Sequence, residues 1–185
     1  MVMEDYAWVV EYLSRGRAVG LRQEPIVQLV GDQFFTLLEA TAKPDANITV
    51  GAKIFVGKGD RTEVDRIKGR IEYTELTTGA KDIVPNVVRK IVESREAVFV
   101  NFINKAGPIS MRVHQLDLIP GIGKKNMELI LKEREKKPFE NFADLKARVG
   151  TLGDPAAIFV HRIISEMEGK ERYYLFVKPQ LKRPY

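Results

Sequence analysis

Anion binding is the chemistry that the residues around position 122 offer. Gly121 and Gly123 flank one apolar residue, and Lys124 and Lys125 follow directly. Glycine permits positive φ angles and close approach of the backbone to another group. If a helix begins at about Lys124, its first backbone N–H groups have no partner within the helix, and the positive end of the helix dipole lies at the same place. Together with the two lysines, these donors can bind a phosphate through the backbone.

Two helices joined by a tight turn would position these residues. Pro120 and Gly121 are poorly tolerated inside a helix, so the first helix, expected over residues 109–118, ends near Ile119. Apolar side chains recur at helical spacing after the turn and predict a second helix over residues 124–137. The alternative is a purely structural turn between two helices that binds no ligand.

The stretch from Leu118 to Lys125, Leu-Ile-Pro-Gly-Ile-Gly-Lys-Lys, resembles the helix-hairpin-helix motif, in which apolar-x-Gly-apolar-Gly precedes a helix. The resemblance implies non-specific binding of a DNA or RNA backbone. It implies that the phosphate-facing N–H groups are those of Gly121, Gly123, Lys125 and Asn126. The candidate nucleic-acid-binding residues are therefore Gly121, Ile122, Gly123, Lys124, Lys125 and Asn126.

The same resemblance places hairpin carbonyls that can hold a monovalent cation at Asp117, Ile119 and Ile122. No other cofactor is expected. One departure from the motif is Met127, which stands four places after the second glycine, where a small residue is usual. The larger side chain predicts a wider separation of the two helices.

Composition excludes several classes of protein. The 185 residues include no cysteine, which excludes disulfides, zinc ribbons, iron–sulfur clusters and thiol catalysis. No run of 18 apolar residues exists, and the first residues are acidic where a signal peptide is basic. We therefore expect a cytoplasmic protein with no membrane contact. The formal net charge of +5 permits binding of a polyanion.

The first part of the chain is rich in short β-strands separated by turns. The expected strands are 6–13, 25–30, 34–40, 48–56 and 63–72. This spacing favours a small barrel, and residues 1–75 resemble an OB-like β-barrel that a terminal strand at 172–178 could complete. Its arginines and lysines could form a groove for single-stranded nucleic acid, or simply a solvated face. The rings available for base stacking, or alternatively for the core, are Phe34, Phe35, Phe55 and Tyr73.

Helical patterns dominate after residue 75. Residues 76–107 read as connecting helices, with Pro85 interrupting the first of them. Residues 108–169 read as two hairpin units, since a shift of 30 residues places Thr151 on Gly121, Gly153 on Gly123 and Asp154 on Lys124. Asp154 is a good N-cap whose carboxylate repels phosphate, so the second hairpin, residues 150–153, is mainly structural. Residues 170–185 supply the terminal strand and a basic tail.

A wider resemblance covers nearly the whole chain. Residues 101–116, leading into 118–125, and residues 137–142 resemble an archaeal family catalogued as domain of unknown function, family 655. The resemblance implies an OB-like domain followed by a tandem helix-hairpin-helix unit, and RNA binding in preference to DNA binding. It also implies an association with archaeal information processing, including translation and ribosome maturation, where protein partners are available.

No catalytic site is predicted. The side chains considered for acid, base or metal chemistry are His114, His161, Asp60, Glu63, Asp65, Asp144 and Asp154. The two histidines lack metal-ligand spacing and fit surface or capping positions. A turn followed by a polar strand face explains the cluster at residues 60–65. Asp144 and Asp154 lie beyond the hairpin, where glycosylases of the hairpin superfamily carry a catalytic residue, but Asp154 has a capping role.

These observations predict an α+β multi-domain protein with an OB-like small β-barrel followed by an all-α tandem helix-hairpin-helix domain. The predicted function is non-enzymatic binding of nucleic acid, RNA favoured, through the hairpin at residues 118–125. The alternatives are a protein-interaction module within an information-processing assembly and a nuclease or glycosylase.

Overall fold

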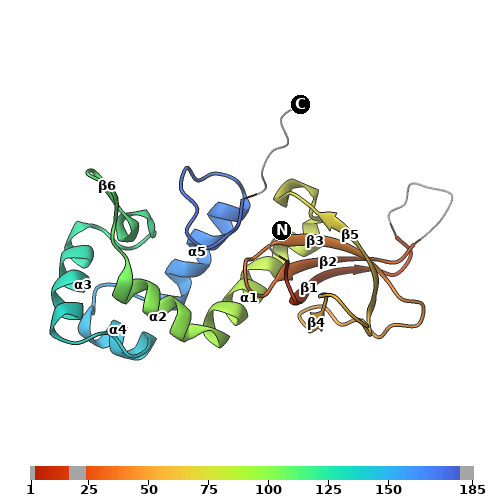
Figure 1. Cartoon of the computed structure of the whole chain (residues 1–185), viewed down its shortest axis with the longest axis horizontal. Coiled ribbons are helices and arrows are strands. Elements are labelled where there is room, and N and C mark those ends of the chain that lie inside the picture. The colour runs from red at the N-terminus through yellow and green to blue at the C-terminus, as the bar shows by residue number, and fades with distance from the viewer. Residues whose placement is uncertain (1–2, 17–23, 180–185) are drawn as a thin grey trace. The chain divides into compact units, whose positions relative to one another are not determined.

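The computed structural model describes residues 3–16 and 24–179, which form an α+β protein (Figure 1). The chain divides into two compact units. The first unit contains the described residues up to Val88 and from Ser165 onward, and the second runs from Arg89 to Ile164. Among the helices in these ranges, none has both the length and the apolar composition that crossing a membrane requires. The predicted boundaries of independently folding domains stay predictions.

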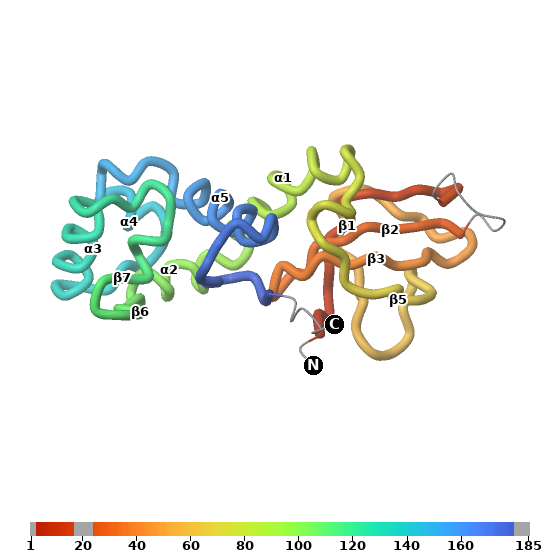
Figure 2. Tube along the Cα trace, turned by 90° about the horizontal axis from the view of Figure 1, so that it is seen from above, coloured from red at the N-terminus to blue at the C-terminus, as the bar shows by residue number. Residues whose placement is uncertain are grey.

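A curled antiparallel sheet forms the first unit (Figures 1 and 2). Its strands are β1 (Tyr6–Leu13), β2 (Ile26–Gly31), β3 (Leu37–Ala42), β4 (Lys53–Phe55) and β5 (Val64–Arg70). The order is β4-β1-β2-β3-β5, with register shifts in the β1–β2 and β3–β5 pairs. Such bulges bend a sheet and increase its twist. Because no described strand joins β4 to β5, the sheet is an open half-barrel and not a closed barrel.

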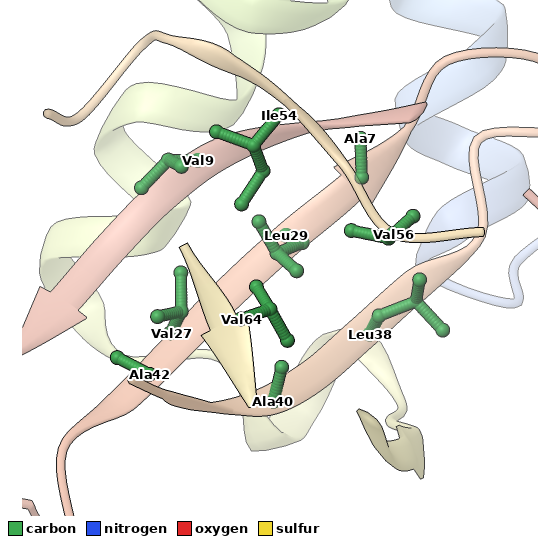
Figure 3. Close-up of a cluster of buried hydrophobic side chains, with 10 residues drawn as sticks. All are labelled: Ala7, Val9, Val27, Leu29, Leu38, Ala40, Ala42, Ile54, Val56 and Val64. Carbon is green, nitrogen blue, oxygen red and sulfur yellow. The ribbon is translucent and has the colours of Figure 1, made fainter. Parts of the chain in front are cut away.

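The hydrophobic core of this unit lies on the inner face of the sheet (Figure 3). It is built from alternate residues of neighbouring strands, as the period of two requires. Its members are Ala7, Val9, Val27, Leu29, Leu38, Ala40, Ala42, Ile54, Val56 and Val64. The intervening Gln28 is fully buried on the other face, where its side chain donates to the Glu75 carbonyl (3.1 Å) and accepts from the Thr77 N–H (3.0 Å). These bonds attach η1 (Tyr73–Glu75) and the start of α1 (Thr78–Ser94) to that face.

The predicted terminal strand at 172–178 is wrong, because these residues contain no strand. Their backbone donors are taken by a buried carboxylate instead. Glu166, which is 1% exposed, accepts from the N–H groups of Leu175 (2.8 Å), Phe176 (3.0 Å) and Val177 (2.8 Å). Three successive N–H donors bound to one side chain cannot also pair with a neighbouring strand. The apolar and aromatic composition of residues 172–178 therefore did not decide their conformation.

Short helices form most of the second unit. They are α2 (Glu96–Lys105), η2 (Gln115–Leu118), α3 (Lys124–Lys136), α4 (Phe142–Arg148) and α5 (Pro155–Met167), of which α5 ends in the first unit. Phe159 is fully buried, with the ring centroids of Phe99, Phe142 and Phe102 at 4.9, 5.9 and 6.3 Å. This aromatic cluster brings α2, α4 and α5 together.

The helix predicted over residues 109–118 is wrong. The chain forms a small hairpin of β6 (Pro108–Ser110) and β7 (Val113–His114), followed by the single 3₁₀ turn η2. Met111, Val113, Leu116 and Ile119 have the spacing of an apolar helix stripe, but they do not form one, because Met111 is fully exposed. Leu116 is the one buried residue of this stretch, and Ile119, which follows it, is also buried.

The interruption predicted at Pro85 is also wrong, since α1 continues through it. A proline inside a helix removes one backbone hydrogen bond and crowds the preceding turn, at a cost of about 3 kcal/mol. Val84, Val87 and Val88 are buried on one side of this helix and offset that cost. Helices α3 and α5, in contrast, begin within about one residue of the positions predicted by the expected start at Lys124 and the N-cap at Asp154.

Candidate nucleic-acid interface

A tight turn over residues 119–122 connects η2 to α3. The Ile122 N–H donates to the Ile119 carbonyl (3.0 Å), and Gly121 has a φ of +91°. Proline at the second position and a left-handed glycine at the third are typical of a type II turn. Ile119 and Ile122 are 1% and 3% exposed, so the turn is anchored in the core of its unit at both ends.

The start of α3 offers unpartnered donors. Gly123 is the N-cap, no side chain caps the helix, and the first helical bond runs from the Met127 N–H to the Gly123 carbonyl (2.9 Å). Within the ranges that the structure describes, no acceptor takes the N–H groups of Lys124, Lys125 and Asn126. Both lysine side chains are exposed and form no ion pair with any described residue. Donors, helix dipole and ammonium groups are therefore available at one point. The resemblance implied two of these three N–H groups, those of Lys125 and Asn126, and phosphate binding by them stays a prediction.

The Asn126 side chain fixes the geometry of this site. Its Nδ2 donates to the Gly121 carbonyl (3.0 Å), and its Oδ1 accepts from the Thr151 hydroxyl. The side chain thus joins the first turn to the second hairpin. The backbone N–H of Asn126 and the second N–H of its Nδ2 remain available for an anion.

The carbonyls predicted to hold a monovalent cation lie beside a buried positive charge. Arg162 is 2% exposed, and its Nη1 donates to the Leu118 carbonyl (2.7 Å), between Asp117 and Ile119 in the chain. A guanidinium repels a second cation, most strongly away from solvent. The Ile119 carbonyl also accepts within the turn. Cation binding at Asp117, Ile119 and Ile122 stays a prediction, and Arg162 opposes it.

The second turn, residues 149–152, is closed by the same hydrogen bond, but its left-handed glycine follows the turn and its chemistry is different. The Leu152 N–H donates to the Val149 carbonyl (3.0 Å), and Gly153 has a φ of +78°. The Asp154 carboxylate accepts from the Ala156 N–H (3.0 Å), which confirms the predicted cap, and it pairs with Arg89 (2.8 Å). The N-terminus of α5 is therefore neutralised by the chain itself.

The pKa of Asp154 reflects these contacts. Partial burial raises the pKa, but the hydrogen bond and charge of Arg89 and the backbone donors at the start of α5 outweigh burial and hold it below its usual value. Asp154 therefore stays ionised near neutral pH, and its negative charge disfavours a phosphate at this helix.

The predicted stacking residues differ in accessibility. Phe35 is 2% exposed, so of the two alternatives given for it, base stacking or the core, it belongs to the core. Phe55 packs edge-on against the half-exposed Tyr6, at 5.5 Å between ring centroids. Sequence reasoning missed Tyr6, although its alternation with the buried Ala7 and Val9 was a usable signal. The other two rings lie beside lysines: Phe34 near Lys178 and Tyr73 near Lys81.

Several cations on or beside the strands of the sheet are paired with carboxylates. Arg17 and Arg22 lie outside the described residues. Three of the others have carboxylate partners: Lys53 with Asp32 (2.9 Å), Arg66 with Glu24 (3.7 Å) and Lys68 with Glu39 (3.3 Å). Compared with the start of α3, the sheet thus offers less free positive charge to a polyanion.

The other candidate residues have local structural roles. The Nδ1 atom of His114 accepts from the Leu116 N–H (3.1 Å), so this histidine caps η2, and His161 is exposed. The Glu140 N–H and Arg148 bind the Asp144 carboxylate and lower its pKa. In the described part of the chain, no three His, Asp or Glu side chains lie close enough to ligate one ion. The absence of catalysis stays a prediction.

Sequence reasoning missed two residues that shape the site. Arg162 lies between Phe159 and Ile163 on the buried side of α5, so a cation at an apolar position of the helix was the available signal. Thr151 binds Asn126 across 25 residues, and neither residue type nor spacing indicated that bond.

Comparisons with known proteins extend over nearly the whole chain. The family model described as "Protein of unknown function (DUF655)" matches residues 3–178. The uncharacterized protein MJ0038 of Methanocaldococcus jannaschii is 42% identical over 177 residues, which are 95% of this chain and 80% of that protein. The crystal structure of Af1531 from Archaeoglobus fulgidus has a TM-score of 0.88 at 39% identity, covering 95% of this chain and 100% of the other.

Proposed function

This chain belongs to the DUF655 family, and we propose that it binds the phosphate backbone of a nucleic acid without catalysing a reaction. The observation that supports the proposal best is the start of α3. There, three backbone N–H groups without acceptors and two exposed, unpaired lysines follow a rigid turn. Helix N-termini with free donors bind phosphate through both hydrogen bonds and the helix dipole. RNA is favoured over DNA by the family resemblance.

The finer architecture belongs to the same proposal. We infer that the half-barrel is an OB-like domain and that the turns at 119–122 and 149–152 are the two hairpins of a tandem helix-hairpin-helix unit. Their 30-residue offset and matching turn bonds support the second assignment. The left-handed glycines do not coincide, since Gly121 lies inside the first turn and Gly153 follows the second. A cytoplasmic role in translation or ribosome maturation fits this assignment and the archaeal relatives.

Binding through these groups has a defined signature. Backbone amides and ammonium groups contact phosphates, which are the same at every nucleotide, so affinity depends weakly on sequence. Each neutralised phosphate releases a condensed counterion, so affinity falls steeply as the salt concentration rises.

The test is binding of labelled single-stranded RNA, structured RNA and duplex DNA across a salt series. The wild type is compared with the double variant Lys124→Glu, Lys125→Glu. We expect at least about a tenfold loss of affinity for every ligand near 0.1 M salt, with a salt slope reduced by about two. Glutamate is favourable at a helix N-terminus, so the variant keeps α3 folded.

A matched control distinguishes the loss of a local phosphate contact from the loss of net positive charge. Lys58→Glu with Lys90→Glu makes the same change in net charge at exposed lysines without ion pairs to described residues. It should retain most of the affinity. Equal losses in the two double variants, or unchanged binding in the first, would reject the start of α3 as the phosphate site.

A protein-interaction module is the second candidate. Val98, on the surface of α2, is 50% exposed although it is apolar, which is the observation that favours this reading. Association with a protein that persists at high salt, together with no binding to any of the three nucleic acids, would support it.

A further inference from the structure

The β6–β7 hairpin carries an apolar side chain at its tip. Met111 is fully exposed, more than any other large apolar residue of the described chain, and Ile109 beside it is 38% exposed. Figure 1 shows β6 at the margin of its unit. Such exposure contributes nothing to the core and leaves these side chains available for a partner.

The base of this hairpin is held firmly. The Gly107 N–H donates to the Gln115 side-chain oxygen and the Gln115 N–H donates to the Gly107 carbonyl, both at 2.9 Å. The His114 N–H donates to the Asp117 carboxylate (3.3 Å), which completes a capping box around η2. Because η2 leads directly into the 119–122 turn, the hairpin and the start of α3 are parts of one hydrogen-bonded segment.

The charge of this segment favours a polyanion as partner. Lys105, Arg112, Lys124 and Lys125 are exposed, and none forms an ion pair with a described residue. The cations further along the chain are different: Lys136 and Arg148 pair with Glu133, and Lys137 pairs with Glu140. Asp117 is the one carboxylate between residues 105 and 125, and it binds the His114 N–H.

We propose that this hairpin enters a groove of a double-stranded nucleic acid and places Met111 against the bases, while the start of α3 holds the adjacent backbone. The proposal rests on the proposed function and narrows its ligand to a duplex or a base-paired RNA segment. A two-stranded β-ribbon fits the major groove of B-form DNA. In proteins that bind the minor groove, apolar side chains such as methionine wedge between base steps and unstack them. Arg112, next to Met111, supplies charge for the flanking phosphates.

The absence of cysteine from the chain permits a site-specific test. Met111→Cys and the control Val98→Cys, 50% exposed on α2 of the same unit, each carry one benzophenone maleimide. The probes are a duplex RNA and a duplex DNA of about 16 base pairs, and the single strand of each. We expect crosslinks to bases of a duplex from position 111, several-fold more than from position 98 or to single strands.

A second measurement uses the unlabelled protein. A duplex containing 2-aminopurine should brighten on binding wild type, because unstacking raises its fluorescence. Met111→Ser should abolish that rise and weaken duplex binding about fivefold without changing the salt slope, since no charge is lost.

The outcomes separate this inference from the proposed function. One outcome overturns the groove contact alone. In it, duplex binding depends on Lys124 and Lys125, but positions 111 and 98 crosslink equally and Met111→Ser has no effect. No binding of any nucleic acid overturns both. Salt-resistant capture of a protein through position 111, without duplex crosslinks, also overturns it and identifies the hairpin as a protein-docking element.

Discussion

The two turns of the second unit, 119–122 and 149–152, are closed by the same hydrogen bond but differ in the place of their left-handed glycine and in the residue that begins the next helix. Each has a bond between its first carbonyl and fourth N–H, at 3.0 Å, with buried apolar residues at both ends. Lys124 then begins α3 with a free charge, whereas Asp154 caps α5 and pairs with Arg89. One helix start is open to an anion, and the other is closed by the chain's own carboxylate.

The turn alone is therefore not sufficient for a phosphate site. Free N–H groups exist at the start of every helix, and they bind an anion only when no nearby side chain takes them. The second turn has instead a positioning role, because Thr151 binds the Asn126 side chain that holds the first turn. The pair is therefore asymmetric, with one turn supporting the donors of the other.

The largest predicted difference comes from the two left-handed glycines. At Gly121, an alanine Cβ would lie 3.0 Å from Ile158 Cγ2, whereas at Gly153 it would meet nothing within 4 Å. Both alanines are strained by positive φ, so we expect a loss of about 1 kcal/mol for Gly153→Ala and about 2 kcal/mol for Gly121→Ala. Urea unfolding of both variants measures this, and equal losses would contradict the packing difference.

The next prediction concerns the link between the turns. Asn126→Ala removes the bond to the Gly121 carbonyl and the partner of the Thr151 hydroxyl. We expect a loss of about 1 kcal/mol in unfolding free energy. A double-mutant cycle with Thr151→Val should give a coupling of about 0.5 kcal/mol or more. Additive effects would show that the two turns are stabilised independently.

Sequence reasoning predicted this pair of turns better than their surroundings. Glycine and proline limit local backbone geometry, so the turns, the starts of α3 and α5 and the Asp154 cap could be predicted. The hairpin at 108–114, the irregular segment at 172–178 and the continuous α1 could not, because tertiary contacts decide them. Three backbone donors bind the buried Glu166, and buried valines stabilise a helix through Pro85. Pairings across many residues, such as Arg162 with Leu118, leave no local pattern.

A smaller effect should follow from making the second turn less acidic. Asp154→Asn keeps a good N-cap, removes the negative charge and leaves Arg89 paired with Glu93 alone. We expect nucleic-acid affinity to rise about two- to fivefold at low salt. Asp82→Asn, at an exposed position of α1, makes the same charge change and should have less effect. Equal gains in both variants would attribute the rise to net charge alone.

The smallest predicted effect is the pH dependence of the second turn. Because the folded-state pKa of Asp154 is lowered, its ionised form stabilises the native state at pH values above its unfolded pKa of about 3.9, and that contribution disappears as the pH falls through the lower folded value. The side chain is 46% exposed, so solvent screening keeps the contribution below about 1 kcal/mol. Wild type should therefore exceed Asp154→Asn in unfolding free energy at pH 7 and lose that advantage by about pH 2 to 3. Lys124→Gln, which alters the first turn without removing a carboxylate, should differ from wild type by the same amount at both pH values. A constant gap between wild type and Asp154→Asn would show that the Arg89 contact does not stabilise the second turn through its charge.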